Sequence, residues 1–346
     1  NFMRDTANQV VLGTFVATFV YCLLVLRTIR RADEVAFVPH LSVSIGVLLA
    51  MVSIGVLIFF IHHVSVSIQA DEVVTRVGRE LKDGIDRLFP DHIGKPGSEV
   101  SKAPIEADLP AGFAREARPV GSLEDGYLQM IDADALMELA GEEDLLLRLV
   151  RRPGHYLVKG RAMVMVWPGD RVTETLVDKM NAAFVLGNQR TAAQDVEFSF
   201  QQLVEIAVRA LSPGINDPFT AIACVDRLGS ALCRLARRDM PSALRFDRHG
   251  RLRLVAQGSS FAGIVDTAFN QIRQSARSNP AVAIRLLDVI AQIAGHVQRA
   301  PDAACLHRQA GMIVTGAREA VPEAEDLLAV ETAFMAATQA LGALHG

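Results

Sequence analysis

The 346-residue sequence predicts a mainly α protein, in which transmembrane helices precede a soluble α+β region made of a small β domain and an α-helical bundle. Two long apolar stretches without charge lie near the N-terminus, and a helix needs about 20 such residues to cross a bilayer. Short runs of β-forming residues fill the middle of the chain. After residue 170 the apolar residues recur almost throughout with the period of a helix.

The transmembrane region is expected to comprise residues 1–66. Its two spans are residues 10–26, VVLGTFVATFVYCLLVL, and residues 41–61, LSVSIGVLLAMVSIGVLIFFI. Neither span contains Asp, Glu, Lys or Arg. Because the chain opens with Asn1 where a helix is already under way, we expect further residues upstream. The lipid bilayer is therefore a predicted partner.

Small and hydroxylated side chains recur within both spans. Ser42, Gly46 and Ala50 are four residues apart and share one helix face, where another helix can approach closely. The polar candidates for lining a conduction path are Thr14, Thr18, Ser42 and Ser53. Such hydroxyl groups also bond to their own helix, so both interpretations stay open.

The soluble part is expected to begin with an amphipathic stalk helix at residues 67–90, which continues the second span and carries Val77, Leu81 and Ile85 on one face. That face can pack on its own domain or on a neighbouring subunit. Residues 91–113, rich in Gly, Pro and Ser, are a predicted linker. The small β domain is expected at residues 114–170 and the helical bundle at residues 171–346. The predicted bundle helices are roughly 172–187, 196–211, 218–238, 258–277, 280–297, 301–319 and 324–343.

The segment from Arg190 to Leu228 is the most unusual part of the bundle. Ser212-Pro213 ends one predicted helix, and Asn216 or Asp217 caps the next, with Pro218 in its first turn. That local role explains the break by itself. In the alternative, polar side chains gather around the break and hold an anion with the free N–H groups of the second helix. The candidates are Arg190, Asp195, Gln202, Glu205, Arg209, Asn216, Asp217, Asp226 and Arg227.

Composition and motifs argue against several kinds of function. The formal net charge of -4 does not favour nucleic-acid binding. None of the four cysteines is part of a C-x-x-C pair, which argues against zinc. The glycine pair Gly311 and Gly316 precedes Ala317-Arg318, where a phosphate loop needs Lys and Ser or Thr. We therefore expect no enzyme, no metal and no cofactor.

Two segments carry a resemblance to a known family. FIHHVSVSIQA at the end of the second span, and RTAAQDVEFSFQQLVEIAVRALSPGINDPFTAIACVDRL, resemble the predicted bacterial membrane proteins grouped as domain of unknown function 2254. The resemblance covers the whole chain. It implies further transmembrane helices upstream and a place in the bacterial inner membrane, and it gives no catalytic residue.

Two functions follow as hypotheses. The first is a homo-oligomeric channel or transport-type protein with a soluble gating domain, indicated by the small-residue stripes and the hydroxyl groups of the spans. The second is a non-conducting, membrane-anchored scaffold or sensor for a small ligand or ion, favoured by the absence of charge within the spans. The orientation depends on basic residues on the two sides of the spans. Arg4, Arg76, Arg79 and Lys82 lie on one side and Arg27, Arg30 and Arg31 on the other, a count that slightly favours a cytoplasmic soluble domain.

Overall fold

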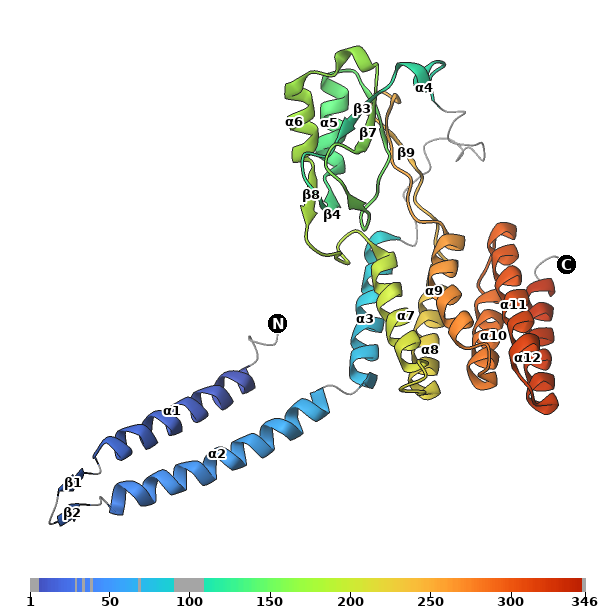
Figure 1. The fold of residues 1–346 in the computed structure, drawn as a ribbon. Helices are drawn as coiled ribbons and strands as arrows, with labels where there is room; N and C mark the ends of the chain where they lie inside the picture. The colour runs from blue at the N-terminus through green and yellow to red at the C-terminus, as the bar shows by residue number, and fades with distance from the viewer. Residues whose placement is uncertain are drawn as a thin grey trace. The chain divides into compact units, whose positions relative to one another are not determined.

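The computed structural model describes residues 6–28, 30–32, 35–37, 40–67, 70–89 and 109–343. The chain forms two compact units, Asn1–Val73 and Val74–Gly346 (Figure 1). Most of the linker expected at residues 91–113 lies outside the described residues.

The first unit is a helical hairpin of α1 (Thr6–Thr28) and α2 (His40–Ser67). The antiparallel strands β1 (Arg30–Ala32) and β2 (Val35–Phe37) join the two helices. Within the described residues one segment, His40–Ile58 with a mean hydropathy of 2.6, is long and apolar enough to cross a membrane. The apolar stretch of α1, Gly13–Arg27, is shorter than a membrane span requires. The prediction of two spans is therefore supported for the second span only.

Polar groups and small residues join the two helices of this hairpin. The Thr18 and Ser53 hydroxyl oxygens lie 2.9 Å apart, and the Tyr21 hydroxyl donates to the Ser42 carbonyl at 3.1 Å. A Cβ atom on Gly46 would lie 3.6 Å from the Tyr21 ring. Ser42 and Gly46 of the small-residue stripe therefore pack against α1 of the same chain, whereas Ala50 is exposed.

Helix α3 (Ala70–Leu88) is the expected amphipathic helix, and it is a separate element because α2 ends at Ser67. Its apolar stripe is buried within the chain at Val74, Val77, Leu81 and Ile85. Asp86, at the end of α3, accepts hydrogen bonds from Arg234 of α8 and from Arg238, which follows that helix. The stripe therefore packs on the chain's own bundle.

The α+β region follows and contains two sheets (Figure 1). One has five strands in the order β3-β7-β5-β10-β9, and the other has three in the order β6-β4-β8. The strands are β3 (Arg118–Gly121), β4 (Gly126–Ile131), β5 (Leu146–Leu149), β6 (Tyr156–Leu157), β7 (Ala162–Trp167), β8 (Phe184–Gly187), β9 (Leu244–Phe246) and β10 (Leu252–Val255). The helices of this region are α4 (Phe113–Glu116), α5 (Ala133–Glu142) and α6 (Glu174–Ala182).

Three of these strands, β8, β9 and β10, come from residues 171–346, where a helical bundle was expected. The predicted helix at residues 172–187 is the shorter helix α6 followed by β8. The hairpin β9–β10 lies between two bundle helices, and β10 pairs with β5 in parallel. Arg253 fixes β10 in place through ion pairs to Asp144 at 2.8 Å and Asp247 at 2.9 Å. The α+β region is therefore larger than residues 114–170.

The bundle contains the remaining helices of the described chain (Figure 1). They are α7 (Val196–Ala210), α8 (Pro218–Ala236), α9 (Phe261–Ser275), α10 (Pro280–Ala294), α11 (Ala300–Ala320) and α12 (Ala324–Gly342). Each begins within three residues of a predicted helix, because periodic apolar residues mark the buried face. Phe200, Leu228, Phe269 and Ile290 are fully buried where neighbouring helices pack.

Candidate functional site

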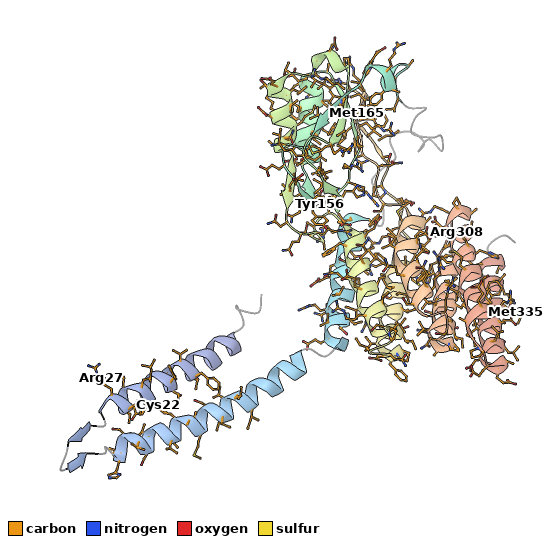
Figure 2. The ribbon with its side chains drawn as sticks, viewed as in Figure 1. Cys22, Arg27, Tyr156, Met165, Arg308 and Met335 are labelled. Atoms are coloured by element: carbon orange, nitrogen blue, oxygen red, sulfur yellow. The ribbon has the colours of Figure 1, made fainter. Side chains whose placement is uncertain are left out.

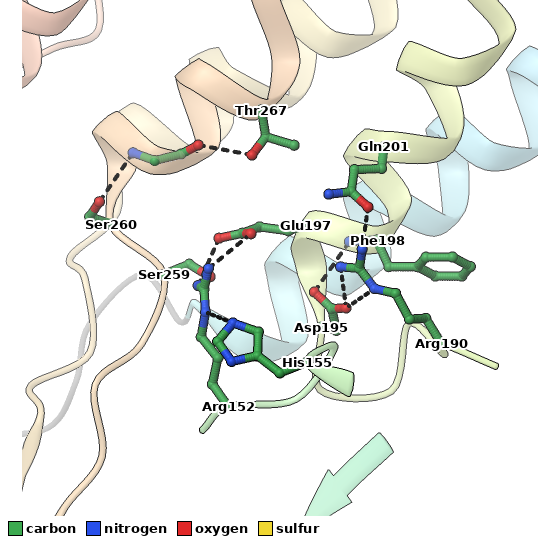
Figure 3. A network of polar contacts seen from close by, with 11 residues as sticks. Arg152, His155, Arg190, Asp195, Glu197, Phe198, Gln201, Ser259, Ser260 and Thr267 are labelled. Carbon is green, nitrogen blue, oxygen red and sulfur yellow. Dashed lines mark hydrogen bonds and ion pairs between the residues drawn. The ribbon is translucent and has the colours of Figure 1, made fainter. Parts of the chain in front are cut away.

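A polar cluster lies where the α+β region meets the first turns of α7 and α9 (Figure 3). We call it the junction network. Its members come from the turn between β5 and β6, the loop after β8, α7, and the loop before α9. They are Arg152, His155, Arg190, Asp195, Glu197 and Ser259.

Arg152 and Glu197 form the first ion pair of the network. Arg152 Nη1 donates to Glu197 Oε1 at 2.7 Å, and Nη2 donates to Oε2 at 3.0 Å. Nη1 also donates to Ser259 Oγ at 2.5 Å. The Glu197 side chain is 12% exposed and that of Arg152 is 32% exposed. One guanidinium group therefore joins a turn of the α+β region to α7 and to the segment before α9.

Arg190 and Asp195 form the second pair. Arg190 donates to Asp195 Oδ2 from Nε at 2.9 Å and from Nη2 at 2.6 Å. Asp195 also caps α7, because its Oδ1 accepts from the Phe198 backbone N–H at 3.2 Å. Burial raises the pKa of the Asp195 carboxyl above its ordinary value, and the hydrogen bond from Arg190 opposes that rise. The pair fixes the start of α7.

Gly154 allows the α+β region to reach this pair. Its φ of 92° lies in the left-handed region, and a Cβ atom built there would lie 2.1 Å from Asp195 Oδ2. No side chain fits at that distance. Glycine therefore meets two requirements here, the turn between β5 and β6 and the contact with the start of α7.

His155 contributes a buried nitrogen atom with unused hydrogen-bonding capacity. Its Nε2 accepts from Arg152 Nε at 3.3 Å, which places the proton of the neutral ring on Nδ1. That Nδ1 is buried and lacks a hydrogen-bond partner within the described part of the chain. Burial, and then the charges of Arg152 and Arg151, lower the pKa of His155 below 6.5. The ring is therefore neutral near pH 7.

A cavity of about 280 Å³ adjoins the network. Its lining contains two arginines, Arg151 and Arg152, but a single carboxylate, Glu197. The start of α9, capped by Ser260, also borders it, and the first N–H groups of a helix carry partial positive charge. Among the described residues Arg151 is exposed and forms no ion pair. The full lining is Leu149, Val150, Arg151, Arg152, His155, Glu197, Gln257, Gly258, Ser260 and Gly263.

The polar residues predicted around the helix break do not all lie together. Arg190 and Asp195 meet before α7, whereas Asn216 and Asp217 follow its other end, about 22 Å away for a helix of 15 residues. Asp217 caps α8 by accepting from the Thr220 backbone N–H at 3.1 Å.

The remaining candidates lie along α7 and α8. Glu205 and Arg209 are exposed on α7, and Gln202 is half-buried there. Arg227 donates to Thr75 of α3 at 3.3 Å, and Asp226 pairs with Arg285 of α10. Arg227 and Asp226 thus serve contacts between helices and do not join a common polar site.

Sequence reasoning overlooked Arg152, His155, Glu197 and Ser259. The sequence RRPGH at residues 151–155 indicates a turn at Pro-Gly, and it places three basic side chains around that turn. No spacing rule connects this turn with residues 197 and 259. Within the described chain no group of three or more His, Cys, Asp or Glu side chains could hold a metal ion.

Comparison with known proteins supports the family expected from the motifs. The profile described as "Predicted membrane protein (DUF2254)" matches residues 1–292. The chain is 32% identical over 347 residues to the uncharacterized proteins Mb1321c of Mycobacterium bovis and Rv1290c of Mycobacterium tuberculosis. These alignments cover 98% of this chain and 64% of each relative. No solved structure matches. The chain therefore belongs to the DUF2254 family of predicted membrane proteins.

Proposed function

We propose that this membrane protein is a non-conducting sensor, whose soluble unit binds a small anion in the cavity beside the junction network. The observation that carries the proposal is the excess of positive charge in that cavity. Two arginines face one carboxylate there, at the start of a helix. This setting favours an anion that bears phosphate or carboxylate oxygens.

The unused donors of the cavity support the same ligand class. Arg151 offers a guanidinium group outside the Arg152–Glu197 pair, and His155 offers its Nδ1–H group. An anion bound by these two donors and by the N–H groups at the start of α9 would contact both the α+β region and α9. Binding would thereby stabilise one arrangement of these two parts, which is what a sensor requires.

The channel hypothesis from the sequence stays a prediction, to which this hairpin lends no support. Thr18 and Ser53, two of the four candidates for lining a pore, share a hydrogen bond with each other. Ser44 donates to the His40 carbonyl of its own helix at 2.9 Å. We place the soluble unit on the cytoplasmic side of the bacterial inner membrane from the arginine distribution, and homo-oligomerisation also stays a prediction.

Inorganic phosphate, with sulfate and chloride for comparison, can be titrated into the full chain in nanodiscs and followed by calorimetry. We expect Arg151→Gln to weaken phosphate binding about tenfold or more, since a hydrogen bond to a charged group contributes about 1.5–3 kcal/mol. Arg161→Gln, at an exposed arginine of the same α+β region, is the matched control. Equal losses in both variants, or no binding of any of these anions, would overturn the proposal. Anion-dependent ion flux in liposomes would favour the channel instead.

A further inference from the structure

The turn between α7 and α8 exposes large apolar side chains to solvent. Phe219 is 81% exposed, more than any other large apolar side chain in the described chain, and Ile215 is 56% exposed. The turn itself does not require them. The Asp217 N–H donates to the Ala210 carbonyl at 2.8 Å, and Asp217 with Pro218 begins α8. Two large apolar side chains four residues apart at one exposed turn form a small apolar patch, and exposed apolar patches mark surfaces that contact another molecule or a membrane.

Ion pairs and hydrogen bonds show which end of the bundle carries this turn. Helices α3 and α8 run parallel, because Thr75 near the start of α3 contacts Arg227 in the middle of α8, and Asp86 near the end of α3 contacts Arg238 just after α8. Phe219 precedes Arg227 by about 12 Å of helix, and Ala70 precedes Thr75 by about 7.5 Å. Phe219 therefore lies within about 5 Å of the level at which α3 begins.

Chain continuity connects this end of the bundle to the apolar helix of the other unit. Helix α2, which contains the candidate span His40–Ile58, ends at Ser67, and α3 begins at Ala70. Those three residue steps extend at most about 11 Å. Helix α2 continues for nine residues, about 14 Å, beyond Ile58, where the candidate span ends. The chain therefore reaches α3 within about 25 Å of the end of the span, and the exposed turn lies at the level at which α3 begins.

We propose that the turn from Leu211 to Phe219 docks onto the bilayer surface, with Phe219 and Ile215 entering the boundary between headgroups and acyl chains. Aromatic side chains are enriched at this depth. Arg209 is exposed in the last turn of α7, where its charge can reach lipid phosphates while its methylene groups follow the apolar surface. The occupant of this surface is the lipid of the membrane that holds α2.

This docking is independent of the proposed anion site. The cavity adjoins the start of α7, and the turn follows its end. Anchoring the turn to lipid would limit the movement of α7 and α8 relative to the membrane plane.

The experiment places a tryptophan at the turn. The wild-type protein contains one tryptophan, Trp167 in β7, so its emission gives the background signal. We expect Phe219→Trp in the full chain, reconstituted in vesicles that contain lipids brominated near the headgroup, to lose much of its added emission. Lipids brominated at the acyl ends should quench less, because an interfacial side chain enters only about 5–10 Å.

Two exposed apolar positions serve as matched controls, Met335 of α12 at 61% exposure and Tyr156 of β6 at 55% (Figure 2). Met335→Trp and Tyr156→Trp should keep their emission in the same vesicles. Equal quenching at the three positions would overturn the proposal, as would no quenching at Phe219→Trp. Emission that shifts to the blue with protein concentration, without quenching by lipid, would assign the surface to a second copy of the chain and also overturn it.

Discussion

Asp247 forms the turn between β9 and β10. Its Oδ1 accepts from the backbone N–H groups of His249 at 2.8 Å and Arg251 at 3.0 Å, and its Oδ2 accepts from Arg253 at 2.9 Å. These bonds, the one to Arg251 first, lower the pKa of Asp247 from 3.8 to about 2. The charged carboxylate therefore stabilises the hairpin.

The effect of pH on this contribution follows from the direction of the shift. Because the pKa is lower in the folded chain, the stabilisation is complete above about pH 4 and is lost as the pH falls toward about 2. We expect Asp247→Asn to unfold at a lower temperature than the wild type near neutral pH, with a difference that shrinks between pH 4 and 2. Thermal unfolding followed by Trp167 fluorescence measures it. Asp178→Asn, at an exposed residue of α6, should show no such change of the difference with pH.

At the scale of residues, sequence patterns predicted local roles well and convergence poorly. Asp217 was one of two residues predicted to cap α8, and it does cap that helix. This role could be predicted because a cap depends only on neighbouring residues in the chain. The junction network joins residues 152, 197 and 259, which are distant in the chain. Only the tertiary fold brings them together, so no spacing rule identifies the cavity.

At the scale of elements, short runs of β-forming residues predicted the β domain, and periodicity predicted the bundle helices. The hairpin β9–β10 was missed because its strands are short. Its sequence at residues 244–255 nevertheless consists of two strand-like runs, LRF and RLRLV, on either side of the turn DRHG. Gly250, with a φ of 75°, completes that turn. A charged hairpin between two long helices resembles an ordinary loop when periodicity alone is considered.

Close approach of α8 and α10 gives a prediction at this scale. A Cβ atom on Gly229 would lie 2.4 Å from Val289 Cγ1. We expect Gly229→Ala to lower the free energy of unfolding by about 1–3 kcal/mol, since the added methyl group overpacks the interface.

The matched control is Gly311→Ala in α11, where an added Cβ meets no atom within 4 Å. That change should leave stability unchanged or raise it by up to about 1 kcal/mol. Adding Val289→Ala to Gly229→Ala should restore part of the loss in denaturant unfolding. Independent, additive effects of the two changes would contradict the close contact.

At the scale of the soluble unit, Arg152 and Glu197 connect the α+β region to the bundle. Trp167 reports on the α+β region, whereas far-ultraviolet circular dichroism reports mainly on the bundle helices. In the wild type we expect both signals to change at one temperature. Glu197→Gln removes one charge of a partly buried pair, which costs about 1–3 kcal/mol, and should separate the two transitions.

Glu325→Gln is the control for that experiment, because Glu325 also lies in the first turn of a helix but is exposed. Its two transitions should stay together. A single transition in Glu197→Gln would show that other contacts join the two parts.

At this scale the sequence predicted a membrane-bound chain with a soluble α+β part, and the family match agrees with the membrane part. It did not predict that β8, β9 and β10 complete the sheets, because strand pairing joins segments far apart in sequence.

The pairing of β10 with β5 has a practical consequence for dissecting the protein. The described chain passes between the sheets and the bundle after β8, before β9 and again after β10. A fragment that stops at Gly187 therefore leaves one side of β5 without its neighbour, a row of open backbone groups that recruits other strands. Such a fragment should aggregate, whereas a cut outside this pairing should not. The sheets and the helices of this unit can therefore be expressed as a folded protein only together.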